Sequence, residues 1–264
     1  MTGGGVCVEL TGAVATILLE PVDRATALDS CTRAQLLLAL DRVASDARVR
    51  AVVLSGGGHD FCDGHDLEEY ARRLARDPHL GLREIEAQTA QVVHALAAVP
   101  QPVIAAVRGR CVGEGLALAL ACDLRVLADD TVLRTSTSVI GASCGGVLRS
   151  TLAPWVGEER ARELLLSGRR FSAREAVEWG LVAEVVPTSH VLDLAHGQAA
   201  MIARLPAAAA ESAKVMLAGA AAVELERALG GGAPAALSSA ARSQRYSKST
   251  AATRADRSSI PAGR

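Results

Sequence analysis

The sequence predicts an α/β fold with mainly parallel strands, because strand patterns alternate with helix patterns along most of its 264 residues. Two stretches carry this prediction, residues 51–66 and residues 103–123. Each has the pattern of a buried strand, a glycine-rich turn and the start of a helix. The chain is long enough for one large domain with an appendage. We expect a core over residues 1–190 and a helical region over residues 191–264.

The stretch 103–123, VIAAVRGRCVGEGLALALACD, has the composition of a ligand-binding turn. Its apolar start is followed by Gly109, Gly113 and Gly115, and such a turn lets a ligand approach the backbone closely. The helix that follows offers N–H groups and the positive end of its dipole, which favour a group that carries or develops negative charge. Two such turns could supply two amides to one carbonyl oxygen as an oxyanion hole. Two ordinary strand-to-helix loops would have the same pattern.

The other elements follow from periodicity and turn residues. Thr11 and Gly12 predict an N-terminal hairpin, and Ser172 with Glu175 predicts a helical capping box. The Ala-rich segment after His190 is expected to be helical and to pack between subunits, because it has too few large side chains for a second core. Helices are expected at 32–45, 85–99, 158–166 and 172–179, and strands at 6–10, 14–20, 124–127, 132–135 and 181–186.

Composition excludes several classes of partner. Lys plus Arg number 28 and Asp plus Glu 29, so the net charge of −1 gives no reason to expect nucleic acid or a charged membrane surface. Aromatic residues make up 2% of the chain, too few for base-stacking platforms. No apolar run reaches the roughly 18–20 residues that a membrane span needs. The start, MTGGGVCVEL, lacks the pattern of a signal peptide.

Cofactor and metal motifs are also missing from the sequence. The six cysteines form no CxxC pair and the six histidines form no HExxH motif, so no metal site is predicted. The glycine turns lack the third glycine of a dinucleotide-binding motif, and no Gly-Lys-Ser/Thr sequence occurs. Unpaired cysteines without an export signal make a cytoplasmic location the simplest expectation.

One motif leaves a hydrolase open as an alternative. Gly141-Ala-Ser143-Cys-Gly145 matches GxSxG, the turn that carries the nucleophile of serine hydrolases. The acid and histidine that should follow could be Asp193 and His196, but these are only three residues apart. A chance match in a loop rich in glycine and serine is the simpler interpretation.

Three segments together resemble the crotonase (enoyl-CoA hydratase/isomerase) superfamily: FCDGHDLEEY at 61–70, GRCVGEGLALALACDLRV at 109–126, and residues 155–187. They occur in the family's order, and the likeness covers about residues 6–190. The resemblance implies a spiral of ββα units with a C-terminal helical trimerisation region, assembled as a homotrimer or hexamer. It also implies an acyl-thioester substrate, carried on coenzyme A or a carrier protein, with no other cofactor.

The resemblance further implies a site in which the thioester carbonyl lies between two backbone amides. These correspond to the N–H groups of His65 and Glu114. The other implied substrate-binding positions are Arg24, Ala25, Ala27, Phe61, Asp63, Gly64, Gly113, Ala117, Thr137 and Gly141.

The chain departs from the family at the catalytic positions. Hydratases of the family use two glutamates as acid and base, and the corresponding positions here hold Ala117 and Thr137. Neither side chain exchanges a proton near neutral pH, so ordinary hydration should lose both catalysts. We therefore expect an enzyme that stabilises an enolate with non-standard acid and base groups, as a decarboxylase, a C–C lyase or cyclase, or an isomerase. A non-catalytic acyl-binding or assembly subunit is the alternative.

Three further side chains near this site bear on the chemistry. Glu114 replaces a usual glycine, and its carboxylate would oppose an enolate if it pointed inward. His65 could move a proton at neutral pH or could be a solvent-facing residue at the start of a helix. Cys144 could be a nucleophile or a small packed turn residue. The nearby acids are expected to favour the first turn of a helix: Asp63, Asp66 and Glu68.

Overall fold

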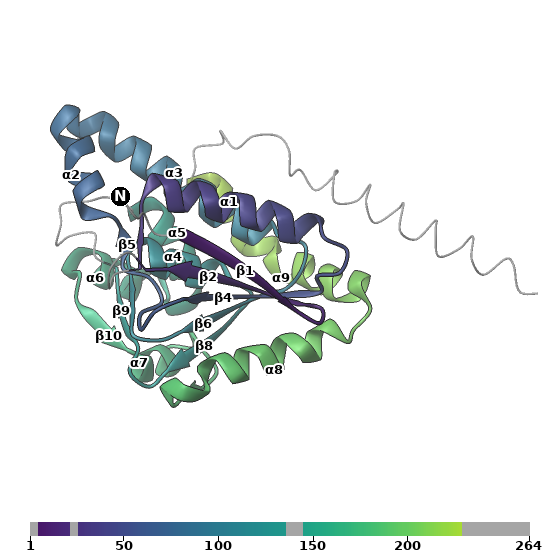
Figure 1. The fold of residues 1–264 in the computed structure, drawn as a ribbon. Coiled ribbons are helices and arrows are strands. Elements are labelled where there is room, and N and C mark those ends of the chain that lie inside the picture. The colour runs from purple at the N-terminus through teal and green to yellow at the C-terminus, as the bar shows by residue number, and fades with distance from the viewer. Residues whose placement is uncertain (1–4, 22–25, 136–144, 229–264) are drawn as a thin grey trace, which may run out of the picture.

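The computed structural model describes residues 5–21, 26–135 and 145–228. Its centre is a six-stranded sheet in which β1 and β2 form an antiparallel hairpin and the other neighbours pair in parallel (Figure 1). The predicted hairpin is present, and it turns at Gly12–Ala13, one residue beyond the predicted Thr11–Gly12. In spatial order the strands are β1 (Gly5–Thr11), β2 (Val14–Glu20), β4 (Ala51–Gly56), β6 (Val103–Val107), β8 (Leu124–Ala128) and β11 (Val185–Val186).

Two smaller sheets bring the glycine turns together. In the first, β3 (Ala27–Leu28) pairs in parallel with β5 (Gly64–His65). In the second, β7 (Arg110–Val112) pairs with β9 (Val132–Arg134), which pairs with β10 (Arg170–Ser172). A bridge between Cys62 and Cys111 links the segment before β5 to β7. Segments about 50 residues apart in the chain are therefore joined along their backbones.

Four helix starts carry a side-chain cap. Asp29, Asp66 and Asp77 each accept a hydrogen bond from an amide of the first turn, and Ser172 with Glu175 forms the predicted capping box. The helices are α1 (Ser30–Ser45), α2 (Leu67–Arg76), α3 (Pro78–Ala98), α4 (Glu114–Ala121), α5 (Gly145–Val156), α6 (Glu158–Ser167), α7 (Ala173–Glu178), α8 (Val191–Ala203) and α9 (Ala207–Ala228), with a short 3-10 turn at Thr188–His190.

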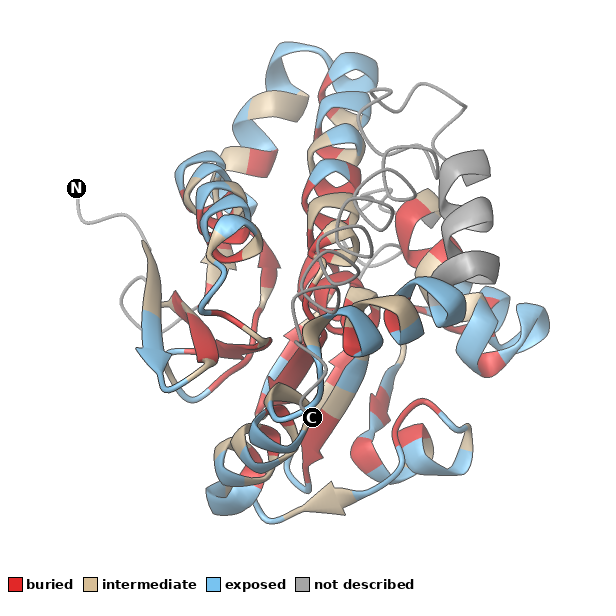
Figure 2. Ribbon diagram, turned by 90° about the vertical axis from the view of Figure 1, so that its right-hand side faces the viewer, coloured by how far each residue is buried: buried red, intermediate tan, exposed pale blue. Residues whose placement is uncertain are grey.

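The six-stranded sheet separates two apolar cores, because alternate residues of each strand point to opposite faces. On β4, Val52 and Leu54 face the core shared with α1, α3 and α4, whereas Ala51 and Val53 face α8. Buried residues accordingly concentrate in the central strands and on the inward sides of the helices (Figure 2). The sheet is thus covered by helices on both faces. The core on the side of α1, α3 and α4 extends to the N-terminus of α4.

The structure corrects two of the sequence predictions. Helix α8 packs on the sheet of its own chain through Val191, Ala195 and Ala199, so the expectation that everything after His190 lies between subunits is wrong for α8. Small side chains let it lie close to the sheet. The strand predicted at 181–186 shrinks to β11, because the Leu181 amide bonds the Ala176 carbonyl at the end of α7. The domain boundary at residue 190 stays a prediction.

Candidate functional site

The two glycine turns meet where β5 lies against the N-terminus of α4. Gly64 has a φ of +84°, and a Cβ there would lie 2.7 Å from the Val112 carbonyl oxygen and 3.3 Å from the Glu114 amide nitrogen. A Cβ at Gly115 would lie 2.5 Å from the Cys62 carbonyl oxygen. Only glycine permits both approaches, and they bring the two turns into backbone contact.

The amide of Glu114 occupies a helix N-terminus. Glu114 is the first residue of α4, and the ladder of this helix begins at the Ala117 amide, which donates to the Gly113 carbonyl at 3.1 Å. The Glu114 N–H is therefore one of the first-turn donors that have no acceptor inside the helix. His65 follows Gly64 directly in β5, so its amide belongs to the strand that lies against this helix start.

The side chains of His65 and Glu114 point toward Arg33 of α1, and the three form a buried cluster. Arg33 Nε lies 3.0 and 3.1 Å from the two Glu114 carboxylate oxygens, and Arg33 Nη2 lies 2.8 Å from Oε2. The side chains of Arg33, His65 and Glu114 are 7%, 6% and 0% exposed. The prediction that His65 could be solvent-facing is wrong. The Glu114 carboxylate is neutralised by a guanidinium rather than left unpaired beside the amides.

Both ring nitrogens of His65 face protein groups. Nδ1 lies 3.0 Å from Glu114 Oε2 and also contacts Arg33 Nη2. Because arginine only donates, Nδ1 accepts from Arg33 when it carries no proton and donates to Glu114 when it does. The Thr89 hydroxyl donates to the Ile85 carbonyl and lies 3.5 Å from Nε2, where it can accept from an Nε2–H. The ring is thus engaged on both edges.

Burial and hydrogen bonding set the charge states around the amides. Burial alone would raise the pKa of Glu114, but the hydrogen bond from His65 and the Arg33 charge outweigh it and hold this pKa at about 2. Glu114 is therefore ionised at neutral pH. Burial also raises the pKa of the neighbouring Cys62 thiol, so this thiol stays protonated and is a poor nucleophile.

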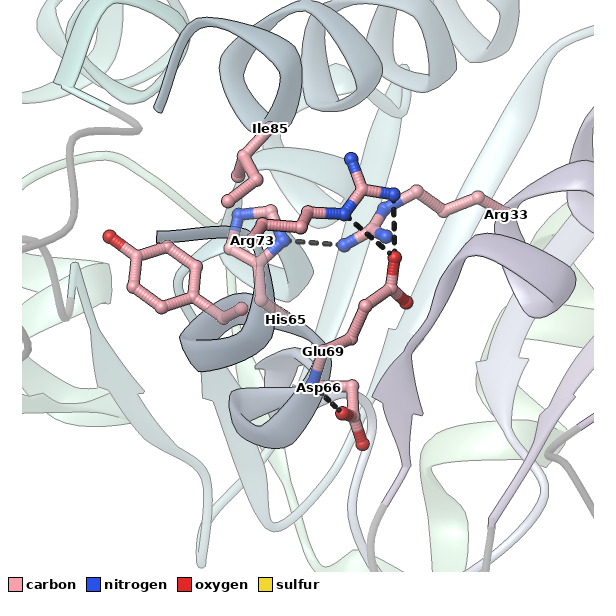
Figure 3. Close-up of a pocket in the computed structure, with 7 residues that line it drawn as sticks. Arg33, His65, Asp66, Glu69, Arg73 and Ile85 are labelled. Carbon is pink, nitrogen blue, oxygen red and sulfur yellow. Dashed lines mark hydrogen bonds and ion pairs between the residues drawn. The ribbon is translucent and has the colours of Figure 1, made fainter. Parts of the chain in front are cut away.

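A small polar pocket lies beside His65, lined by side chains from α1, α2 and α3 (Figure 3). Its volume of about 10 Å³ is at the lower limit for holding a single water molecule. Glu69 and Arg73 are ion-paired with each other, and Glu69 accepts hydrogen bonds from Ser30 at the start of α1. The lining residues are Arg33, His65, Asp66, Glu69, Tyr70, Arg73 and Ile85.

Several residues predicted to bind substrate lie along β3 and β5. Ala27 is in register with Gly64, and the Asp63 amide donates to the Thr26 carbonyl at 2.8 Å. The Phe61 side chain is fully buried, so this residue offers a ligand only its backbone. The Asp63 carboxylate pairs with Arg110 instead of serving a helix start, and burial raises its pKa.

The remaining predicted residues divide into two groups. Ala117 is fully buried in α4, one turn beyond Gly113, and Asp66 caps α2 with Glu68 in its first turn, as predicted. The other positions lie outside the described residues: Arg24, Ala25, Thr137, Gly141, Ser143 and Cys144.

The geometry around His196 gives no support to the hydrolase alternative. His196 Nε2 lies 3.0 Å from the Thr16 hydroxyl, on the face of the sheet that α8 covers. Helix α5, which begins two residues after Ser143, packs into the core on the opposite face through Val147 and Leu148. His196 therefore lies on the face of the sheet opposite to α5, and Ser143 itself lies outside the described residues.

Sequence reasoning missed Arg33 and Thr89. The available signal for Arg33 was its place on an apolar helical face, since it stands three and seven residues before the buried Leu36 and Leu40. A charged residue on such a face needs a buried partner. No comparable signal distinguished Thr89, whose partner His65 lies 24 residues away.

No metal cluster or membrane-spanning helix occurs in the parts of the chain that the structure describes. Within residues 5–21, 26–135 and 145–228, no group of three or more His, Cys, Asp or Glu side chains is placed to hold a metal ion. In the same ranges, no helix combines the length and the apolar content that crossing a bilayer requires.

Known proteins share this sequence and fold. Residues 9–248 match the model of the enoyl-CoA hydratase/isomerase family. The 4-chlorobenzoyl coenzyme A dehalogenase-2 of Arthrobacter sp. is 37% identical over 180 residues, which cover 68% of this chain and 65% of the dehalogenase, just under two thirds of its length.

Two solved structures resemble this fold closely. The enoyl-CoA hydratase from Bacillus anthracis has a TM-score of 0.74 at 30% identity, covering 86% of this chain and 90% of that one. A monofunctional enoyl-CoA isomerase from M. smegmatis has a TM-score of 0.69 at 29% identity, covering 82% and 93%. The predicted crotonase-like α/β fold is confirmed, and the chain belongs to the enoyl-CoA hydratase/isomerase family, the crotonase superfamily.

Proposed function

We propose that this chain binds an acyl-CoA thioester with its carbonyl oxygen between the amides of His65 and Glu114, and stabilises the enolate that forms there. The contact between Gly64 and the Glu114 amide carries the proposal, because it brings the two amide-bearing turns together at a helix N-terminus. Donors fixed before reaction stabilise developing negative charge without the cost of reorganising. The choice of coenzyme A follows the names of the relatives, which include a coenzyme A dehalogenase.

The reaction favoured here is cleavage of the C–C bond between the α-carbon of the thioester and the carbon attached to it, as in decarboxylation. In such a step the electrons of the broken bond become the enolate, so no general base has to remove an α-proton. This suits a site with Ala117 and Thr137 where hydratases have glutamates. It also suits a His65 ring whose two nitrogens face Arg33, Glu114 and Thr89 rather than a substrate. A proton from solvent or a substrate group would then quench the enolate.

A non-catalytic acyl-binding subunit is the second candidate. The same missing glutamates favour it, since a protein that only binds a thioester needs the amides but no acid or base. It differs from the first candidate in one respect only, the absence of product.

A thioester panel tests both candidates. The full chain is titrated with butyryl-CoA by calorimetry, then incubated with malonyl-CoA, methylmalonyl-CoA, acetoacetyl-CoA and crotonyl-CoA, with products identified by mass spectrometry. Loss of CO₂ or an acyl fragment supports the proposal. Binding without any product favours the non-catalytic subunit. Failure of every CoA thioester to bind, while butyryl groups on a carrier protein do bind, contradicts the choice of coenzyme A.

A further inference from the structure

Arg33 contacts the side chains of both residues whose amides form the proposed oxyanion hole. It donates to both carboxylate oxygens of Glu114, and its Nη2 contacts His65 Nδ1. It reaches them from α1, an element that carries neither glycine turn. Of the described residues, no other cation lies within ion-pair distance of Glu114 except His65 itself.

We propose that Arg33 is a positioning residue for the oxyanion hole, an inference that rests on the proposed function. Its planar fork fixes the Glu114 carboxylate through two nitrogens and sets the distance to His65 at the same time. Because Glu114 is the first residue of α4, fixing its side chain also fixes the direction of its backbone N–H. The two amides are then held at one separation by a single guanidinium.

Arg33 also governs the charge that an enolate meets. An ionised Glu114 without a counter-ion would place a full negative charge on the same residue whose amide faces the developing oxyanion. The buried site has little water to screen that charge. The paired guanidinium cancels that charge. The hole therefore keeps its preference for negative charge although it contains a glutamate.

Stability alone gives a weak reason for such a cluster. Buried ion pairs are often replaceable by apolar residues of similar size without loss of stability, because burying the charges costs about as much as pairing them returns. A role in stability and a role in positioning therefore predict different results when both charges are removed together. The double variant Arg33→Met/Glu114→Gln makes that distinction, since it leaves no unpaired buried charge.

The experiment uses butyryl-CoA labelled with ¹³C at the thioester carbonyl, bound to the full chain. Hydrogen bonds to the carbonyl oxygen lower its infrared stretching frequency. We expect a clear downshift in the unmodified protein, an equal or larger one in Glu114→Gln, where Arg33 keeps its charge, and loss of most of it in the double variant. With any thioester that is turned over, kcat should fall by about 10²-fold in the double variant, the usual effect of about 1 Å of misplacement, with KM changed less.

Lys214→Met is the matched control. Lys214 of α9 forms a partly buried ion pair with Asp123 at 2.8 Å and donates to the Gln101 carbonyl, so it contacts neither glycine turn. Its loss should lower the melting temperature but leave the carbonyl shift unchanged. If the double variant does not fold, Arg33→Lys replaces it, since lysine supplies the charge without the fork and should give an intermediate shift.

The outcomes distinguish the role of Arg33 from the existence of the oxyanion hole itself. A wild-type carbonyl shift that persists in full in the double variant, or in Arg33→Lys, overturns the role of Arg33 and leaves the proposed hole intact. No shift in the unmodified protein, despite bound butyryl-CoA, overturns the hole at His65 and Glu114 and the role of Arg33 with it.

Discussion

The Cα of Gly64 lies so close to the amide nitrogen of Glu114 that one added methyl group would stand 3.3 Å from that nitrogen and 2.7 Å from the Val112 carbonyl oxygen. The proposed site therefore depends on a backbone contact that a single Cβ disturbs. Because Gly64 also has a positive φ, alanine there is strained twice, by its own backbone conformation and by this contact.

Gly64→Ala should lower the free energy of unfolding by more than about 2 kcal/mol, since the left-handed conformation alone costs roughly 1–2 kcal/mol. Gly12→Ala is the matched control, because Gly12 also has a positive φ but open space around its Cα. It should cost only about 1 kcal/mol and leave butyryl-CoA binding unchanged. Urea unfolding measures both. Equal costs at the two glycines would mean that the contact with Val112 relaxes easily.

Acid should weaken the protein through Glu114. Its pKa is about 2 in the folded chain against an ordinary value of 4.5, so its contribution to stability is fully present above about pH 4.5 and is lost as the pH falls toward 2. The difference corresponds to roughly 3 kcal/mol. The advantage of the wild type over Glu114→Gln in free energy of unfolding should shrink by that amount between pH 5 and pH 2. Parallel curves would show that Glu114 is not the group that titrates.

Proline at position 114 should abolish one donor of the hole. It removes the N–H, and the first position of a helix tolerates proline. We expect a loss of about 2.7–4 kcal/mol of transition-state stabilisation, read from kcat/KM with a thioester that is turned over. Glu114→Ala removes the same carboxylate but keeps the N–H, and should lose clearly less. Full activity of the proline variant, with an unchanged circular dichroism spectrum, would locate the site elsewhere.

Hydration of crotonyl-CoA should be several orders of magnitude slower than in an ordinary hydratase, because acid and base groups contribute about 10² to 10⁴-fold each. Ala117→Glu with Thr137→Glu should recover part of the rate. Ala117→Gln with Thr137→Gln is the control, since amides of the same shape transfer no proton. Ala117 is fully buried, so calorimetric binding of crotonyl-CoA must accompany each rate. Rapid hydration by the unmodified protein would mean that other groups transfer the protons.

Assembly into a trimer or hexamer is expected from the family resemblance, with the apolar surface of α9 packed between copies. Met216 and Leu217 are 82% and 83% exposed, next to the half-exposed Val215. Covering them against another copy would remove this apolar area from water. Light scattering should give the mass of three or six chains, and Met216→Glu/Leu217→Glu should lower it. A clean monomer at micromolar concentration would contradict this expectation.

The sequence by itself determined the elements and the family, because the signals for both are local. The continuous apolar runs of β4 and β6, the N-terminal hairpin and the capping box at Ser172 are signals that act over a few residues. Their order in the chain was enough to predict the α/β fold. The glycines at 64 and 115 likewise predicted a turn that a ligand approaches, and the structure brings those two turns into contact.

Only the tertiary structure decided what the charged side chains do. Arg33 and Glu114 are 81 residues apart, and no local pattern encodes their pairing. The direction of the His65 ring, inward to Arg33 and Glu114, likewise depends on how α1, β5 and α4 pack together. The position of α8 on its own sheet depends on which faces were left apolar once the strands had paired. A buried charge needs a partner, but which partner it finds is fixed by the packing of distant segments.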